Sequence, residues 1–272
     1  MIPAAFTYLR PSSVEEAIAM IAADEDAKIL AGGHSLLPIM KLRLAAPSSL
    51  VDIGRIEGLS YVNEDAGTIR IGALTRHHDL ATSPLLDERL PLLSHAAGFV
   101  GDPQVRHRGT IGGSLVHGDP ASDLPAVVLA LGGSLVLQGP NGTREVAATD
   151  FFLGFWETAT LPDEILTEIR LPASTDGFGF EKFTRRAQDW AIVGVAVQRN
   201  GAGAGIALVN MGQTPIRARA AEAALAGGAG LEEAAALADE GCEPTADQSA
   251  SSEYRRHLAR VLTARALEAA GF

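Results

Sequence analysis

Cysteine is almost absent from this 272-residue chain, which contains only Cys242. A single thiol excludes a disulfide framework within the chain, and it excludes a zinc ribbon. It also excludes an iron–sulfur cluster held by this chain alone, because such clusters are ligated by about four thiolates. The six histidines other than His34 show no ligand spacing with acidic or thiol partners, so no metal site is predicted.

Basic residues are also scarce, with 22 Lys and Arg against 33 Asp and Glu and a formal net charge of -11. The chain therefore lacks the basic stripe that drives nucleic-acid binding, and we interpret its charge as a solubility feature. No apolar run approaches the ~20 residues of a membrane span. Residues 1–13 lack the basic and apolar regions of a signal peptide. We expect a cytoplasmic protein without nucleic-acid partners.

The composition that remains is ordinary for a globular protein, with 47% hydrophobic and 20% charged residues. Ser13 and Glu16 fit a capping box. The elements expected in the first part of the chain are a helix at 12–23, a strand at 28–31, a helix-like run at 38–45 and a strand at 49–53. These elements predict a small βα lobe.

From about Leu59 the pattern changes. We expect strands and turns at 61–75, a helical stretch at 83–101, a loop-rich segment at 105–123, a helix from Ser122/Asp123 to Gly132, and a hairpin around 140–142. A turn-rich break at 171–177 suggests a domain boundary. After it we expect strands at 189–198 and 205–210 and an alanine-rich helical tail. Its last helix, 253–270, is predicted to turn Leu258, Val261, Leu262 and Ala266 inward and its arginines outward.

The sequence Gly-Gly-Ser-Leu occurs at 112–115 and 132–135, and a close variant with an inserted histidine, Gly-Gly-His-Ser-Leu, occurs at 32–36. The copy at 132–135 follows a helix and precedes a strand, so we interpret it as a helix cap. The other two follow apolar residues, and their consecutive glycine amides can form a nest for phosphate oxygens. Two such loops suit a pyrophosphate held from both sides, although each alone is more often only a turn. The stretch GAGAGI at 201–206 lacks the last glycine of a dinucleotide motif and is predicted to be a hairpin loop.

AGGHSLLPIMKLRLAAPSSLVDI (31–53) and TIGGSLVHGDPASDLPAVVLAL (110–131) resemble the two flavin-binding segments of the medium subunits of molybdenum hydroxylases. The resemblance is strongest to the carbon monoxide dehydrogenase type, and the xanthine dehydrogenase flavin domain is a more distant relative. It covers the whole chain, because similar segments follow in the expected order at 151–160, 163–172, 181–197 and 254–267.

The resemblance implies an α+β fold. Residues 1–173 would form a two-lobed FAD-binding domain of the PCMH/vanillyl-alcohol-oxidase type, with lobes 1–54 and 55–173. Residues 174–272 would form a C-terminal α+β domain with an antiparallel sheet and helices. FAD would lie between the lobes. The residues that would hold it are Ala31, Gly32, Gly33, His34, Ser35, Leu36, Thr110, Ile111, Gly112, Gly113, Ser114, Asp123, Leu166, Lys182 and Trp190.

Several of these residues have simpler interpretations. Asp123 could be only a helix cap, and Leu166 could be only a core residue. Lys182, placed by the resemblance near the flavin ring, would stabilise the anionic reduced flavin, but it could be a surface lysine. Trp190 replaces an aromatic residue, commonly tyrosine, beside the isoalloxazine, and could instead be a core tryptophan.

The resemblance further implies a small partner subunit with two [2Fe–2S] clusters and a large subunit with the molybdenum cofactor, in a dimer of heterotrimers. Electrons would pass through FAD to NAD, a quinone or oxygen, and no side chain of this chain would act as a catalytic acid, base or nucleophile. Two alternatives remain open: a self-contained flavin oxidase, in which His34 could be bonded to FAD, and a nonenzymatic scaffold. For His34 we favour noncovalent binding.

Overall fold

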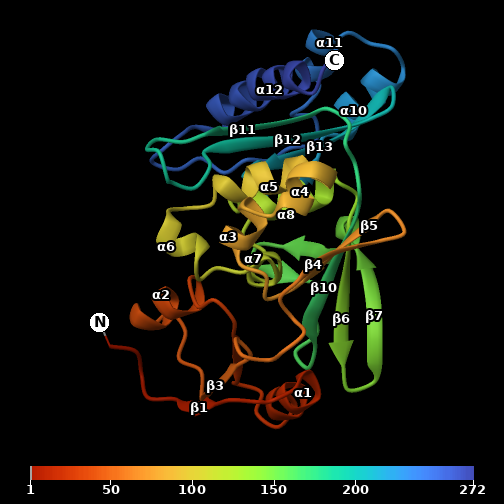
Figure 1. Cartoon of the computed structure of the whole chain (residues 1–272). Coiled ribbons are helices and arrows are strands. Elements are labelled where there is room, and N and C mark those ends of the chain that lie inside the picture. The colour runs from red at the N-terminus through yellow and green to blue at the C-terminus, as the bar shows by residue number, and fades with distance from the viewer. Residues whose placement is uncertain (1) are drawn as a thin grey trace.

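The computed structural model describes residues 2–272, which form three tiers (Figure 1). The lower tier is a parallel three-stranded sheet in the order β1-β3-β2, formed by Thr7–Leu9, Ser49–Asp52 and Lys28–Leu30. Helices α1 (Val14–Ala22) and α2 (Leu36–Lys41) complete this lobe. The predicted βα lobe is therefore confirmed, although its second helix ends four residues earlier than expected.

Only half of the predicted capping box forms at the start of α1. The Oγ atom of Ser13 accepts from the backbone N–H of Glu16 at 3.2 Å. The Glu16 carboxylate reaches back to the backbone N–H of Ser12 at 2.6 Å instead of that of Ser13. Ala17, Ile18 and Ile21 are buried on the inner face of the helix.

The middle tier contains an antiparallel five-stranded sheet in the order β4-β5-β10-β6-β7. Its strands are Val62–Asp65, Thr68–Gly72, Ile165–Pro172, Ser134–Gly139 and Gly142–Ala147. The helices of this tier are α3 (His77–Ala81), α4 (Pro84–Arg89), α5 (Pro91–Gly98), α6 (Pro103–Arg106), α7 (Ile111–His117), α8 (Asp123–Ala130) and α9 (Ala148–Phe151). A short hairpin, β8 (Phe152–Gly154) and β9 (Glu157–Thr158), follows.

The prediction of a loop at 105–123 was wrong, because α7 and the end of α6 lie there. The Asp102 carboxylate caps α6 by accepting from Val105 N at 2.9 Å. The Thr110 hydroxyl caps α7 by accepting from Gly113 N at 3.1 Å. Glycine disfavours helix, but a Cβ atom at Gly112 would lie 2.6 Å from that of Ala73, so close packing requires glycine here. Tertiary contact overrides local propensity in this segment.

The upper tier is an antiparallel sheet in the order β11-β12-β13-β14, formed by Phe178–Phe183, Val193–Asn200, Gly203–Val209 and Ile216–Arg217. Helix α8 of the middle tier packs against β12 and β13, and α12 (Ser252–Ala269) packs against β11 and β12 (Figure 1). Helix α11 (Leu231–Ala236) packs against α12, and α10 (Arg219–Ala226) packs against α11 and β13. The predicted strands and the helical tail are confirmed. A hairpin loop is found where it was predicted, but it is shorter than the expected 201–206, because residues 203–206 already belong to β13.

One prediction for α12 was wrong. Arg255 lies on the buried face, with 2% of its surface exposed. Its guanidinium binds the Asp247 carboxylate at 2.7 Å and the carbonyl oxygen of Ile192, and these partners compensate its burial. Val261, expected inside, is only half-buried.

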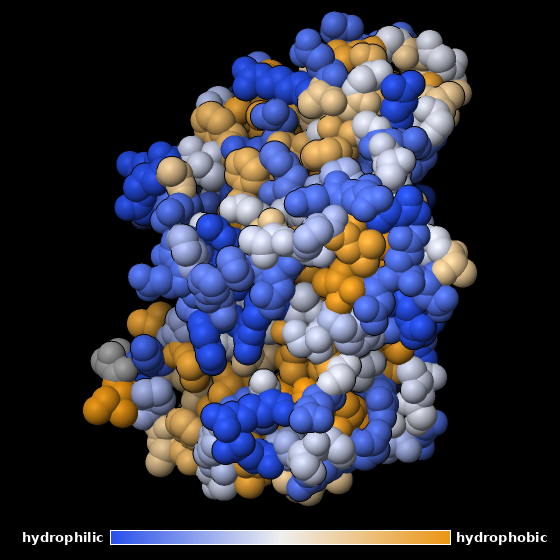
Figure 2. Space-filling view, viewed as in Figure 1, coloured by the Kyte–Doolittle hydropathy of each residue, from blue (hydrophilic) through white to orange (hydrophobic). Residues whose placement is uncertain are grey.

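The apolar cores show how the tiers are joined. The largest core combines α8 of the middle tier with Ala196, Ala207 and Val209 of the upper sheet. The lower lobe has its own small core, to which Leu74 and Ile165 of the middle tier contribute. Hydrophobic residues are visible at the surface between the lower lobe and the middle tier (Figure 2). This junction is where the main cavity opens.

Candidate cofactor-binding site

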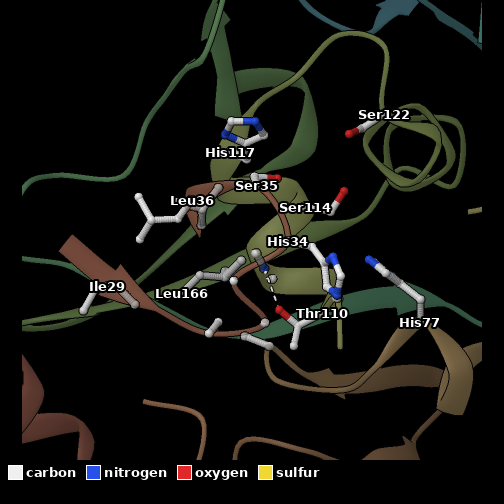
Figure 3. Close-up of a pocket in the computed structure, with 18 of the residues that line it drawn as sticks. Ile29, His34, Ser35, Leu36, His77, Thr110, Ser114, His117, Ser122 and Leu166 are labelled. Carbon is white, nitrogen blue, oxygen red and sulfur yellow. Dashed lines mark hydrogen bonds between the residues drawn. The ribbon is translucent and has the colours of Figure 1, made fainter. Parts of the chain in front are cut away.

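A cavity of about 1110 Å³ is lined by residues from all three tiers. Figure 3 shows part of its lining from the lower and middle tiers. The cavity is larger than the roughly 300–1,000 Å³ of ordinary small-molecule pockets, as an extended dinucleotide requires. All of the predicted FAD-binding residues line it except Ile111. The two Gly-Gly segments, far apart in the sequence, therefore share one cavity.

The first Gly-Gly segment offers a row of free backbone donors. Within residues 2–272, no protein oxygen accepts a hydrogen bond from the N–H groups of residues 32–36. Gly33 adopts φ +80, which turns the chain between β2 and α2. At Gly32 a Cβ atom would overlap the carbonyl oxygen of Arg108. The loop thus presses against the segment that precedes α7, and its free amides are suited to bind an anion.

The second Gly-Gly segment differs from the prediction, because its amides are already occupied. Ile111 N donates to Thr75 O at 3.0 Å, and Gly112 N donates to Ala73 O at 2.9 Å. Gly113 N donates to its capping residue Thr110. The Ile111 side chain is fully buried in the core. This segment therefore contributes a close-packed wall and the hydroxyl groups of Thr110 and Ser114, and the double nest that we predicted does not form.

Asp123 and Lys182 form a buried ion pair in the cavity wall. Lys182 Nζ lies 2.7 Å from the Asp123 carboxylate, and the two side chains are 5% and 6% exposed. Lys182 also donates to Phe99 O at 3.1 Å. Burial raises the pKa of Asp123 to about 6, although the charge of Lys182 opposes the shift. The other carboxylate oxygen, Oδ1, has no protein partner.

This ion pair decides between the interpretations that the sequence left open for Lys182 and for Asp123. Lys182 is not a surface lysine. Asp123 is the first residue of α8, but neither it nor the N-cap residue Ser122 makes a side-chain capping bond. Asp123 lines the cavity, and its buried Oδ1 atom still lacks the hydrogen-bond donor that buried polar atoms normally have.

Trp190 is not a core residue, because 71% of its surface is exposed. It lies on the loop between β11 and β12 at the edge of the cavity. Leu166 is buried in the core and also lines the cavity, so the two interpretations of this residue are compatible. His34 is exposed and lines the same cavity as Thr110 and His77 (Figure 3).

The sequence analysis missed two cavity residues. His77, at the start of α3, is 4% exposed, and its Nδ1 atom has no protein partner. Burial and the neighbouring charge of Arg76 lower its pKa to about 4. Trp156 has φ +58 and stacks on Phe155 and His117, with ring centroids 4.8 and 5.5 Å apart. His77 lies outside the segments that carry the family resemblance. Trp156 lies inside one of them, 151–160, but nothing in that segment marked it as a cavity residue, and the fold brings both side chains to the cavity.

The low pKa of His77 predicts a specific acid sensitivity. The folded chain keeps this imidazole neutral, whereas the unfolded chain protonates it below about pH 6.5. Its contribution to stability is thus present above pH 6.5 and is lost as pH falls towards 4. His77→Phe is expected to reduce the loss of unfolding free energy between pH 6 and 5 by about 1 kcal/mol. Denaturant unfolding at both pH values tests this, and His257→Gln, at an exposed histidine, is the control. An equal loss of unfolding free energy between pH 6 and 5 in His77→Phe and in the parent would contradict the prediction.

These features fit FAD. The free amides of residues 32–36 suit a diphosphate, the orphaned Asp123 oxygen suits a hydroxyl or N–H donor, and Leu166 and Trp190 offer apolar contact to a ring system. Among the described residues no group of three or more His, Cys, Asp or Glu is arranged to hold a metal ion.

Comparison with known proteins agrees with this site. Residues 4–174 match the model of the FAD binding domain in molybdopterin dehydrogenase, and residues 178–270 match that of the CO dehydrogenase flavoprotein C-terminal domain. This chain belongs to that flavoprotein family. It is 44% identical to the carbon monoxide dehydrogenase medium chain of Hydrogenophaga pseudoflava, over 99% of this chain and 98% of the relative.

Two solved structures show how well the medium-subunit fold is kept. Carbon monoxide dehydrogenase from Hydrogenophaga pseudoflava superposes with a TM-score of 0.95 at 46% identity, over 99% of this chain and 98% of that chain. Quinoline 2-oxidoreductase from Pseudomonas putida 86 gives 0.92 at 34% identity, over 99% and 98%. The protein is a FAD-binding medium chain of an oxidoreductase, and it has the predicted α+β fold. In residues 2–272 we find no helix with the length and apolarity needed to cross a bilayer.

Proposed function

We propose that this medium chain transfers electrons within a molybdenum hydroxylase complex, taking them from [2Fe–2S] clusters of a small subunit and passing them through FAD to an external acceptor. A large subunit would carry the molybdenum cofactor and the substrate. The observation that carries the proposal is the single cavity, which is lined both by residues 32–36, whose amides have no protein partner, and by Asp123, whose Oδ1 atom is unpaired. The full-length similarity to medium chains supports it.

Bound FAD would supply the exchange between one-electron and two-electron carriers, because flavins accept electrons singly or in pairs. The chain's own residues bind and orient the group. The amides of residues 32–36 would hold the diphosphate, and the Asp123 oxygen would accept from the cofactor. The Lys182 ammonium donates to Asp123 and Phe99 and has a third N–H left for the cofactor. Its positive charge would favour the reduced, anionic flavin.

The assembly and location of the chain also belong to this proposal. We expect one small and one large partner subunit for each medium chain, two such heterotrimers in the complex, and a cytoplasmic location. The domain limits 1–173, with lobes 1–54 and 55–173, and 174–272 remain part of the proposal. Purification of the intact complex tests it: visible absorption should show flavin together with iron–sulfur bands, and a colourless complex would contradict it.

A self-contained flavin oxidase with FAD bonded to His34 is the second candidate, because His34 is exposed and lines the cavity. We expect acid precipitation of the flavin-loaded chain to leave all flavin in the supernatant, since no covalent bond is proposed. His34→Ala should retain stoichiometric FAD. Flavin that stays on the precipitated parent chain but not on His34→Ala would favour the oxidase and contradict noncovalent binding.

A further inference from the structure

The loop that carries Trp190 receives its support from distant parts of the chain. It spans residues 184–192 between β11 and β12, and its internal ion pair, Arg186 with Asp189, is largely exposed. The two carbonyl groups that follow Trp190 are both bound by side chains from elsewhere. Asn210 Nδ2 donates to Ala191 O at 2.7 Å, and the Arg255 guanidinium donates to Ile192 O.

Arg255 is an unusual residue to place at this position. It is the largest fully buried side chain in the described part of the protein, and its Nε has no partner. The adjacent Arg256 and the nearby Arg260 instead pair with Asp239, where both arginines are partly exposed. Burying a cation is costly unless its hydrogen bonds are used. The Arg255 bond to Ile192 O therefore fixes the backbone two residues after Trp190.

Asn210 joins two walls of the cavity. It follows β13 in the left-handed conformation, with φ +62, which asparagine tolerates better than most residues. Its backbone N–H donates to Pro120 O at 2.8 Å, while its side chain holds Ala191 O. Pro120 precedes the cavity-lining segment 121–123, and Ala191 follows Trp190. One residue thus links the Asp123 wall to the Trp190 loop.

We propose that Asn210 and Arg255 are positioning residues that hold the Trp190 loop, so that the indole is fixed at the mouth of the cavity. The consequence for the flavin rests on the proposed function, because Trp190 would then cover a bound isoalloxazine. We call these two side-chain bonds, from Asn210 to Ala191 O and from Arg255 to Ile192 O, the clamp. The clamp is present in the chain without cofactor. In this arrangement the upper tier supports the loop whose tryptophan would cover the flavin.

The chain contains two tryptophans, so Trp156→Phe leaves Trp190 as the only one. Its fluorescence anisotropy reports the motion of the indole together with that of the loop, and differences between variants of the clamp report the loop. In this background Asn210→Gly removes the side-chain donor but keeps the left-handed backbone and its N–H. Arg255→Met removes the guanidinium, and Arg255→Lys keeps the charge. Arg256→Met is the matched control, because Arg256 is the next residue of α12 and also binds a carbonyl, that of Cys242.

Time-resolved anisotropy of the full-length chain without FAD is expected to show larger nanosecond motion of Trp190 in Asn210→Gly and Arg255→Met, and parental motion in Arg256→Met. Arg255→Lys should restore part of the order. In the flavin-loaded chain, loss of either clamp bond should speed FAD dissociation roughly two- to tenfold. Unchanged anisotropy in Asn210→Gly would overturn the proposal, and so would equal loosening by Arg256→Met. A parent chain that binds no FAD would refute the proposed function alone and leave the anisotropy result standing.

Discussion

Gly32→Ala is expected to weaken FAD binding about a hundredfold, which corresponds to about 2.7 kcal/mol. A methyl group at this position would overlap the carbonyl oxygen of Arg108, so the 31–36 loop has to move away from the segment before α7. The free amides that would hold the diphosphate lie in the displaced loop. Flavin absorbance per chain after dialysis and titration of the apo chain with FAD measure the effect.

Gly98→Ala provides the matched control for this prediction. Gly98 ends α5, and a Cβ atom there meets no other atom within 4 Å. This variant should bind FAD like the parent, which separates the close approach at Gly32 from a general effect of replacing glycine. Parental FAD affinity in Gly32→Ala, with a folded chain by circular dichroism, would contradict the role that we give to the loop.

The position of the first loop could be predicted from sequence because its signals are local. A short apolar strand, two glycines and a helix-like run are adjacent in the chain, and the structure keeps them in that order as β2, the turn and α2. Its role as a phosphate nest remains a prediction, but the free N–H groups of residues 32–36 give it a physical basis. The meeting of this loop with residues 110–114 was suggested by the second Gly-Gly motif and implied by the family resemblance, because no single local pattern shows that two distant segments share a cavity.

The second loop shows where local reasoning failed. Gly112 and Gly113 argue against a helix by propensity, yet α7 forms because Thr110 caps it and Gly112 packs against Ala73. The partner Ala73 lies far away in the sequence, so no local pattern reveals it. As a consequence the amides of this segment are used within the protein, and they do not form the predicted nest.

Arg255 and His77 were missed for the same physical reason. An arginine on an amphipathic helix is predicted to face solvent, and only the nonlocal partners Asp247 and Ile192 O make burial of Arg255 possible. His77 is buried because Gly109 lets the chain pass close to its ring. Sequence periodicity describes the average environment of a face and cannot detect such individual partners.

Lys182→Met is expected to destabilise the folded chain by about 3–5 kcal/mol at pH 8, the cost of leaving a buried charge without its partner. Asp123 would then stay buried with neither an ammonium group nor a capping role, and its pKa would rise above the value of about 6 in the parent. Because a raised carboxyl pKa means that the folded state binds the proton more tightly, the parent gains stability as pH falls through 6 and loses it as pH rises. In Lys182→Met this gain should begin at higher pH.

Guanidinium-induced unfolding at pH 8 and pH 5 therefore distinguishes the buried pair from a simple packing contact. The loss in Lys182→Met should be larger at pH 8 than at pH 5, and Asp123→Asn in the same chain should recover part of it, since the remaining group is neutral. Arg186→Met, which breaks the exposed pair with Asp189, should leave stability unchanged at both pH values. An equal loss at both pH values would mean that the Lys182 methylene chain, and not its charge, supports this wall. The unpaired Asp123 oxygen would then give no support to a cofactor held at this wall.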